Sequence, residues 1–169
     1  MKYFNGFALQ GEDRFFESYL IESDFCVAGF SYGAQKAFEY AHKTDRRIDR
    51  LLLLSPAFFQ HHKTSFIRTQ LRYFRSNQQA YIQQFLKNVA YPSSIDLEPY
   101  LTMGKHEELE FLLGYIWDRE KIMALQERGV TIEVFIRGQD KIVDAQKSFE
   151  FFSKINTVYY FKEQGHLLI

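Results

Sequence analysis

The stretch Cys26–Phe38, CVAGFSYGAQKAF, limits the possible folds of this chain more than any other. A short apolar strand, a Gly-x-Ser-x-Gly turn and a helix with apolar residues at helical spacing follow one another directly. Ser31 stands at the corner, where the backbone must be strained, and the two flanking glycines remove side chains that would collide between strand and helix. The pattern predicts a Ser31 hydroxyl held above a sheet, with the Tyr32 N–H free to donate to a reacting carbonyl oxygen. A tight turn carrying an ordinary exposed serine is the alternative.

The remainder of the chain alternates between strand and helix patterns. Strands are predicted at residues 1–7, 25–28, 48–54, 130–136 and 157–161, with helices beginning near 11, 118 and 144. The near-continuous leucines of 48–54 indicate a strand buried on both faces of a parallel sheet. Residues 57–117 have helical periodicity, one break at 91–94 and no convincing strand. We therefore expect a single α/β domain, with a core of residues 1–56 and 118–169 and a helical lid inserted at 57–117.

Length, charge and cysteine content exclude several classes of protein. A chain of 169 residues is one domain that can bury a sizeable core. Its formal net charge of zero argues against a general nucleic-acid binder. The single cysteine, Cys26, has no internal disulfide partner, and no leader or membrane-spanning run is evident. We expect a cytoplasmic protein without nucleic-acid or membrane partners.

Four loops that follow predicted strands carry residues suited to ester chemistry. Functional groups in an open parallel sheet gather at the carboxyl ends of its strands. The first loop presents the backbone of Gly6 and Phe7, the second Ser31, a later one Asp140 and the last His166. Ester hydrolysis needs a nucleophile, a base, a carboxylate that orients the base, and donors for an oxyanion. These loops offer all of them.

Each candidate also has a simpler explanation. Asp140 could be only a turn residue, and Asp144 could be the functional acid instead of a helix cap; we favour Asp140 because it directly follows the strand. His166 could be a frayed terminal residue, although a glycine before it and apolar residues after it suggest a fixed loop. His61 and His62 lack partners at metal-ligand spacing, so we expect solvated lid residues and no metal site.

Three motifs together resemble those of the α/β-hydrolase family: Gly29–Gly33, Gly138–Val143 and Gly165-His166. The chain departs from the family pattern in two respects. Asn5 stands where the family usually has a histidine. Only a short helix separates the loop of Asn5 from the serine turn, where the family usually has another strand and helix, so the first strand of this chain takes the place of the family's third. The shortened architecture resembles most the short pimeloyl-carrier-protein methyl ester esterases of biotin synthesis.

This resemblance implies roles for individual residues. Ser31 would be the nucleophile, His166 the general base and later acid, Asp140 the residue that orients His166, and the Phe7 and Tyr32 N–H groups the oxyanion hole. The implied reaction is hydrolysis of the methyl ester of pimeloyl-carrier protein, without metal or organic cofactor. An acyl thioesterase, a general short-chain carboxylesterase, or a non-catalytic protein of this fold that only binds a partner remain alternatives.

Charge is unevenly distributed in the predicted lid. Between Arg50 and Ile95 there are basic residues and no Asp or Glu, whereas the segment from 96 to 120 is acidic. Arg68, Arg72 and Arg75 are spaced so that they share one face of a helix. Given the resemblance, this face is a candidate docking surface for an acidic acyl carrier protein. The alternative is that the basic and acidic halves face each other or are both solvated.

Overall fold

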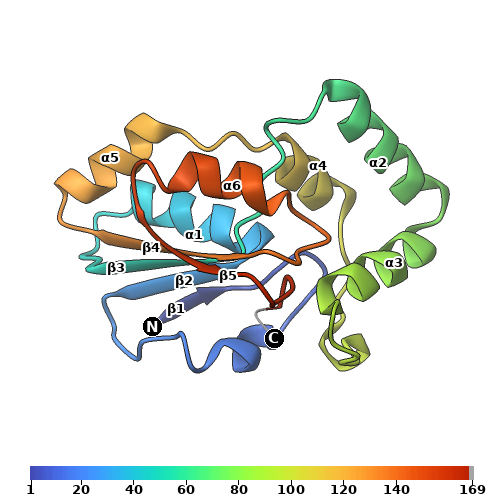
Figure 1. Ribbon diagram of the computed structural model, residues 1–169, viewed down its shortest axis with the longest axis horizontal. Coiled ribbons are helices and arrows are strands. Elements are labelled where there is room, and N and C mark those ends of the chain that lie inside the picture. The colour runs from blue at the N-terminus through green and yellow to red at the C-terminus, as the bar shows by residue number, and fades with distance from the viewer. Residues whose placement is uncertain (168–169) are drawn as a thin grey trace.

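The computed structural model describes residues 1–167, and its centre is a five-stranded parallel sheet (Figure 1). The strands lie in chain order: β1 (Lys2–Phe4), β2 (Cys26–Phe30), β3 (Arg50–Leu54), β4 (Thr131–Arg137) and β5 (Thr157–Phe161). The register pairs Gly29 of β2 with Leu53 of β3, and Leu53 with Val134 of β4. The leucines of β3 are completely buried, as the run predicted for a central parallel strand.

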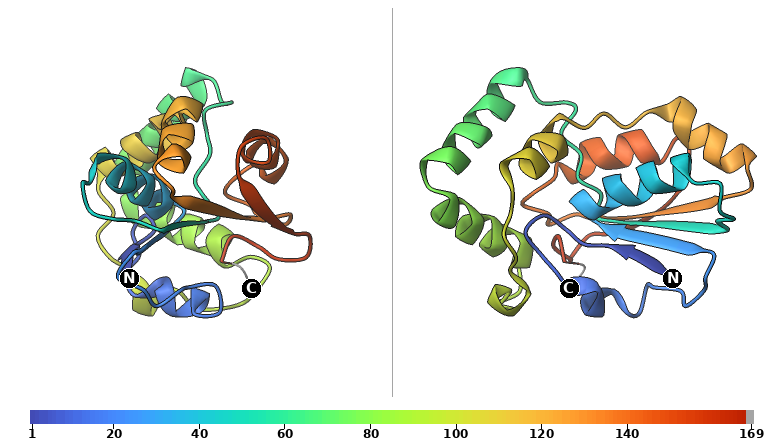
Figure 2. Two further views of the ribbon diagram at one scale, coloured as in Figure 1. Left: turned by 90° about the vertical axis from the view of Figure 1, so that its left-hand side faces the viewer. Right: turned by 180° about the vertical axis from the view of Figure 1, so that it is seen from behind.

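Three α-helices cover one face of the sheet: α1 (Tyr32–Lys43), α5 (Arg119–Glu127) and α6 (Ala145–Phe152). Among the described residues, the opposite face carries a short 3-10 helix, η1 (Glu12–Phe16), and neighbouring loops (Figure 2). Helix α1 packs through Ala34, Ala37, Phe38 and Ala41, so its apolar positions follow the helical period. Two predicted elements are shorter than expected: the first strand ends at Phe4, and the helix predicted to begin near residue 11 is the five-residue η1.

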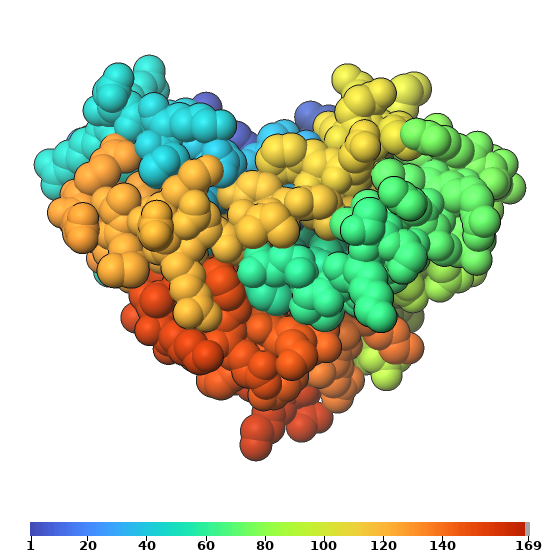
Figure 3. All heavy atoms as spheres, turned by 90° about the horizontal axis from the view of Figure 1, so that it is seen from above, coloured from blue at the N-terminus to red at the C-terminus, as the bar shows by residue number. Residues whose placement is uncertain are grey.

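Residues 57–117 form an insertion at the carboxyl ends of the strands, at one side of the molecule (Figures 1 and 3). It contains α2 (Thr64–Ser76), α3 (Gln78–Ala90), the 3-10 helix η2 (Glu98–Tyr100) and α4 (His106–Gly114). Asn77 ends α2 and caps α3, because its Oδ1 accepts the N–H of Ala80 at 3.0 Å. An isolated antiparallel bridge joins Leu101 to Leu9, so the insertion also contacts the loop after β1.

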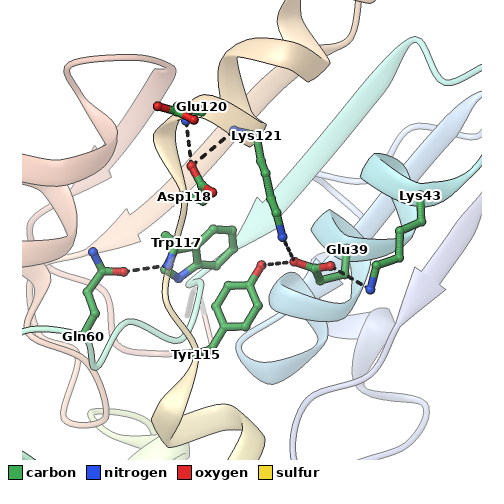
Figure 4. Close-up of polar contacts among 8 residues, drawn as sticks. All are labelled: Glu39, Lys43, Gln60, Tyr115, Trp117, Asp118, Glu120 and Lys121. Atoms are coloured by element: carbon green, nitrogen blue, oxygen red, sulfur yellow. Dashed lines mark hydrogen bonds and ion pairs between the residues drawn. The ribbon is translucent and has the colours of Figure 1, made fainter.

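The end of the insertion is fixed to the core by aromatic and polar contacts (Figure 4). Trp117 is 2% exposed, lies between Phe38 and Phe152, and donates from Nε1 to the Ala57 carbonyl at 2.9 Å. Its backbone N–H donates to Oε1 of Gln60 at 2.7 Å. Both ends of the insertion are thereby joined to each other and to the helical face of the sheet.

Candidate functional site

Ser31 occupies a strained turn between β2 and α1. Its φ of 54° and ψ of −112° lie in a region that residues with a Cβ rarely adopt. The Ser31 N–H donates to the Leu54 carbonyl at 2.9 Å, which ties the turn to the end of β3. The side chain is 1% exposed, and its Oγ has no hydrogen-bond partner among residues 1–167. The hydroxyl of this strained turn is therefore buried and has no acceptor or donor among the described residues.

The two glycines of the motif are required by backbone packing. A Cβ on Gly29 would overlap the carbonyl of Gly33, and a Cβ on Gly33 would overlap the carbonyl of Phe4. Strand β2, the first turn of α1 and the end of β1 therefore meet without intervening side chains. This close approach places Ser31 beside the loop that follows β1.

His166 and Asp140 are joined by a buried hydrogen bond. His166 Nδ1 lies 2.5 Å from Asp140 Oδ2, and the histidine side chain is completely buried. The other carboxylate oxygen of Asp140 accepts the N–H groups of Ile142 at 2.7 Å and Val143 at 2.9 Å. The turn after β4 thus fixes the carboxylate so that Oδ2 is directed at the imidazole.

The chain around His166 is also fixed. Its carbonyl accepts a hydrogen bond from Ser55 Oγ at 2.7 Å, and its ring packs against Phe30 at 4.9 Å between centroids. Leu167 is 1% exposed, whereas residues 168 and 169 lie outside the described part of the chain. His166 Nε2 and Ser31 Oγ are both buried without a hydrogen-bond partner among the described residues. Ser31 directly follows Phe30, whose ring contacts His166. The histidine is therefore held in the core beside the serine turn.

Asp144, the alternative acid, has another function in the fold. Its Oδ1 accepts the N–H of Lys147 at 3.0 Å and so caps α6. Asp140 and not Asp144 contacts His166 in this structure.

The backbone donors expected at Phe7 and Tyr32 lie on the two loops next to Ser31. Tyr32 begins α1, so its N–H has no acceptor in the preceding turn. Neither N–H donates a hydrogen bond to any of residues 1–167. The Phe7 ring is 1% exposed and packs against Phe74 of α2 and Phe85 of α3, at centroid distances of 6.1 and 5.6 Å.

A cavity of about 860 Å³ lies between the insertion and the loop after β4. Its apolar wall comprises Phe59, Phe66, Phe85, Leu109, Leu112, Leu113, Ile142 and Val143. Gln70, Gln84 and Asn88 add polar groups, and Asp140 lies at its edge. This volume and lining suit a chain-like organic ligand. Ser31 and His166 are buried and do not line the cavity.

His61 and His62 also line this cavity, with ring centroids 4.0 Å apart. His61 is exposed, as expected, but His62 is half-buried and stacks on Phe66 at 4.0 Å, so the expectation of two solvated residues is wrong for His62. Partial burial and the neighbouring His61 lower the pKa of His62, which disfavours its protonated form.

The three arginines of α2 share an exposed face. Arg68, Arg72 and Arg75, with Leu71 and Ser76, surround a shallow hollow of about 410 Å³. Arg75 Nε donates to His106 Nε2 of α4 at 2.9 Å. Within residues 1–167, none of the three forms a salt bridge, so the basic and acidic halves of the insertion are not joined by pairs with these arginines.

Two residues near the site were not identified from the sequence. Ser55 was interpreted only as the end of a strand, yet its hydroxyl holds the His166 carbonyl. Glu12 was assigned only to the start of the helix predicted near residue 11, yet it is completely buried. The sequence contains no signal for Ser55, because its partner is 111 residues away. For Glu12 the only signal is an acidic residue shortly before the apolar Phe15 and Phe16.

Over residues 1–167, no three side chains of His, Cys, Asp or Glu lie together in a way that could bind a metal ion. No helix in the same range combines the length and apolarity needed to cross a bilayer.

No family model and no curated protein matches this sequence, but solved structures do match the fold. A hydrolase from Oleispira antarctica superimposes with a TM-score of 0.61 at 12% identity, over 85% of this chain and 58% of that one. Carboxylesterase CesB from Bacillus subtilis gives 0.54 at 19% identity, over 95% and 62%. BioG from Haemophilus influenzae gives 0.59 at 11% identity, over 98% and 87%.

The chain spans less than two thirds of the length of the carboxylesterases it matches, 53% of the naproxen esterase from Bacillus subtilis and 62% of CesB. In this chain the sheet is parallel, the serine turn follows β2, and Asp140 and His166 lie on the loops after β4 and β5. The chain has a minimal form of the α/β-hydrolase fold.

Proposed function

We propose that the protein is a carboxyl ester hydrolase in which Ser31, His166 and Asp140 act together. The observation that carries this proposal is the buried His166–Asp140 hydrogen bond beside a strained Ser31, with Ser31 Oγ and His166 Nε2 both unpartnered among residues 1–167. Structures of the same fold that are named carboxylesterases, esterases and hydrolases support this class of reaction.

The first half of the reaction transfers the acyl group to the protein. His166 Nε2 takes the proton from Ser31 Oγ, which attacks the ester carbonyl carbon, while Asp140 holds the imidazole through Nδ1. The N–H groups of Phe7 and Tyr32 stabilise the oxyanion of the tetrahedral intermediate. The bond from carbon to the alkoxy oxygen then breaks, and His166 gives its proton to the leaving alcohol.

Water completes the cycle. His166 takes a proton from a water molecule, whose oxygen attacks the acyl carbon bonded to Ser31. The second tetrahedral intermediate collapses, the serine oxygen leaves with the proton from His166, and a carboxylic acid is released. The products are one alcohol and one carboxylate, and no metal or organic cofactor takes part in these steps.

For the substrate we propose the methyl ester of pimeloyl-carrier protein. The cavity between the insertion and the core has a volume sufficient for such a chain, and its lining combines aromatic and aliphatic walls with amide groups. The match to BioG extends over nearly all of both chains, unlike the matches to the larger esterases. In this proposal the insertion acts as a lid that opens to pass the acyl chain to Ser31, and the arginines of α2 receive the acidic carrier.

Mass spectrometry of the carrier tests the reaction and the nucleophile together. The purified chain and its Ser31→Ala variant are each incubated with methyl-pimeloyl carrier protein. We expect the wild-type sample to lose one methyl ester and the variant sample to remain unchanged. Loss of the whole acyl group would show that the bond cut is the thioester to the carrier and not the methyl ester, and the protein would then be a thioesterase.

A serine-directed phosphonate separates an enzyme from a non-catalytic relative. An active serine hydrolase takes up one phosphonate on Ser31, and Ser31→Ala takes up none. If the wild-type chain reacts with neither the phosphonate nor any ester, the hydrolase proposal is wrong.

A further inference from the structure

Glu12 is a completely buried carboxylate that the proposed reaction does not use. It begins η1, on the face of the sheet opposite α1. Its Oε1 accepts hydrogen bonds from the Gly6 N–H at 2.6 Å and from the Tyr3 hydroxyl at 3.3 Å, and Oε2 has no partner among residues 1–167. The titratable groups that act on it are the Tyr3 hydroxyl, which is neutral, and the Asp13 carboxylate, so neither supplies a positive charge.

This environment is costly for a carboxylate. Burial raises the pKa of Glu12 above its usual value, although the hydrogen bonds from Gly6 and Tyr3 act in the opposite direction. Buried acidic residues without a cationic partner are uncommon in folded proteins. A leucine or methionine would fill this position without that cost, so the carboxylate must be explained by the contacts it makes.

The main contact of Glu12 is with the residue that precedes the Phe7 donor. Gly6 must be a glycine, because a Cβ there would lie 2.9 Å from the ring of Phe30. Glycine leaves the flanking peptide groups free to rotate. Glu12 accepts the Gly6 N–H and so fixes the peptide group between Asn5 and Gly6. The Leu9 N–H donates to the Gly6 carbonyl at 3.3 Å and so fixes the peptide group between Gly6 and Phe7.

The second of these peptides contains the Phe7 N–H. In a trans peptide the C=O and N–H point in opposite directions, so a fixed Gly6 carbonyl also fixes the direction of the Phe7 N–H. On the other side of the loop, the Phe7 ring is held by Phe74 and Phe85 of the insertion. The loop is therefore held on the insertion side by aromatic packing. On the core side, the Leu9 N–H holds the Gly6 carbonyl, and the buried Glu12 carboxylate holds the Gly6 N–H.

We propose that Glu12 is a positioning residue for the oxyanion hole. It holds Gly6, so that the Phe7 N–H is aligned with the developing oxyanion. This inference rests on the proposed ester hydrolysis. Oxyanion donors contribute only when they are aligned before the reaction, so a loop that rotates at Gly6 would lower turnover without weakening substrate binding.

Two substitutions separate positioning from general stability. Glu12→Gln keeps an oxygen acceptor for Gly6, whereas Glu12→Met has a similar length and removes it. Glu17→Gln is a matched control, because Glu17 follows η1 directly and is exposed. Leu125→Ala is a control for stability: this fully buried residue of α5 lies far from the loop in sequence, and we expect its truncation to lower stability through the cavity it leaves.

Turnover is measured with a small free ester and divided by the concentration of sites that react with the phosphonate. We expect Glu12→Met to lower kcat about 10- to 100-fold, with KM within about twofold. Glu12→Gln, Glu17→Gln and Leu125→Ala should keep kcat per site within about threefold of wild type. An unchanged kcat per site in Glu12→Met would reduce Glu12 to a structural residue and overturn the proposal.

Amide hydrogen exchange at Gly6 tests the same inference without any reaction. We expect slow exchange in wild type and Glu12→Gln, and exchange at least about tenfold faster in Glu12→Met than in Leu125→Ala. Equal exchange in the last two variants would contradict the proposed contact. If wild type hydrolyses no ester but Gly6 exchange follows this pattern, the error lies in the proposed function and not in the role of Glu12 in the loop.

Discussion

Asp140 and Asp144 are four positions apart, and their surroundings give them different functions. Asp140 receives two backbone N–H groups on one oxygen and the His166 imidazole on the other. Asp144 receives a backbone N–H at the start of α6. Because both carboxylates follow β4 in the same loop, the pair provides a comparison between a proposed reaction residue and a helix cap.

Asp140→Asn and Asp144→Asn are expected to differ in turnover. An asparagine at 140 no longer favours the imidazole tautomer in which Nε2 is the base, so we expect kcat to fall about 1,000- to 10,000-fold. Asn and Asp cap helices about equally well, so Asp144→Asn should leave both stability and kcat close to wild type. Steady-state kinetics on a free ester and thermal unfolding measure both effects. An equal loss of turnover in the two variants would contradict the assignment of Asp140.

At the residue scale, the sequence was sufficient where the geometry is local. The positions of Gly29, Ser31 and Gly33 follow from how a strand passes into a helix, and the structure has this turn. Ser55 and Glu12 could not be identified in this way. Their hydrogen bonds depend on which loops meet after the sheet has formed, and nothing in the neighbouring residues encodes that meeting.

At the scale of elements, the order of strands and helices was predicted and their boundaries were less accurate. Strand β3 and strand β5 lie where their apolar residues indicated. The first strand is shorter than predicted because the chain leaves the sheet after Phe4, close to the first turn of α1. Residues 5–11 are apolar enough to continue a strand, but they form a loop that bonds to the insertion instead. The Gln10 N–H donates to the Tyr100 carbonyl, and the Thr102 N–H donates to the Ala8 carbonyl.

Glu39 of α1 receives three hydrogen bonds, from Tyr115 at 2.9 Å, Lys121 at 3.2 Å and Lys43 at 2.9 Å (Figure 4). Burial alone would raise its pKa, but these donors outweigh burial and lower it. The folded state therefore binds fewer protons at Glu39 than the unfolded state does. Its contribution to stability is present above the unfolded pKa and is lost as pH falls through the folded pKa.

Glu39→Gln is expected to lower the free energy of unfolding by about 1 kcal/mol at neutral pH. The difference from wild type should shrink as pH falls below about 4.5, where the carboxylate first becomes protonated in the unfolded state, and should vanish at lower pH, once it is protonated in the folded state too. Urea unfolding at several pH values measures this trend, with Glu17→Gln as the exposed control. A difference that is independent of pH would mean that the charge of Glu39 does not contribute.

At the scale of the whole molecule, the insertion and the core together form the cavity and hold the loop that follows β1. The cavity has walls from α2, α3 and α4 and an edge from the loop that carries Asp140. The oxyanion loop is packed against the same helices through Phe7. The arginines of α2 lie on the surface of the same insertion, so the proposed docking of a carrier would contact the segment that forms the cavity wall.

Charge reversal on α2 tests carrier docking. Arg68→Glu with Arg72→Glu changes two exposed arginines and leaves Arg75, which is bonded to His106. We expect KM for the carrier-bound ester to rise about tenfold or more at low salt, an effect that added salt reduces, while a small free ester is turned over as before.

The matched control is Arg46→Glu with Lys154→Glu, two exposed residues in loops that precede β3 and β5, away from the insertion. This control has the same change in net charge and should leave KM for the carrier-bound ester unchanged. If both double variants raise KM equally, the carrier senses overall charge and not the face of α2.

The sequence by itself determined the α/β class, the strand-turn-helix at Ser31, the helical nature of residues 57–117 and the alignment of three arginines on one helix. All of these depend on contacts within a few residues, where spacing along the chain fixes position in space. Only the tertiary structure decided which aspartate meets His166, that Glu12 is buried beneath the Phe7 loop, and that Ser31 is closed off from the cavity. Those features depend on how segments far apart in the chain pack together, and local patterns do not record that packing.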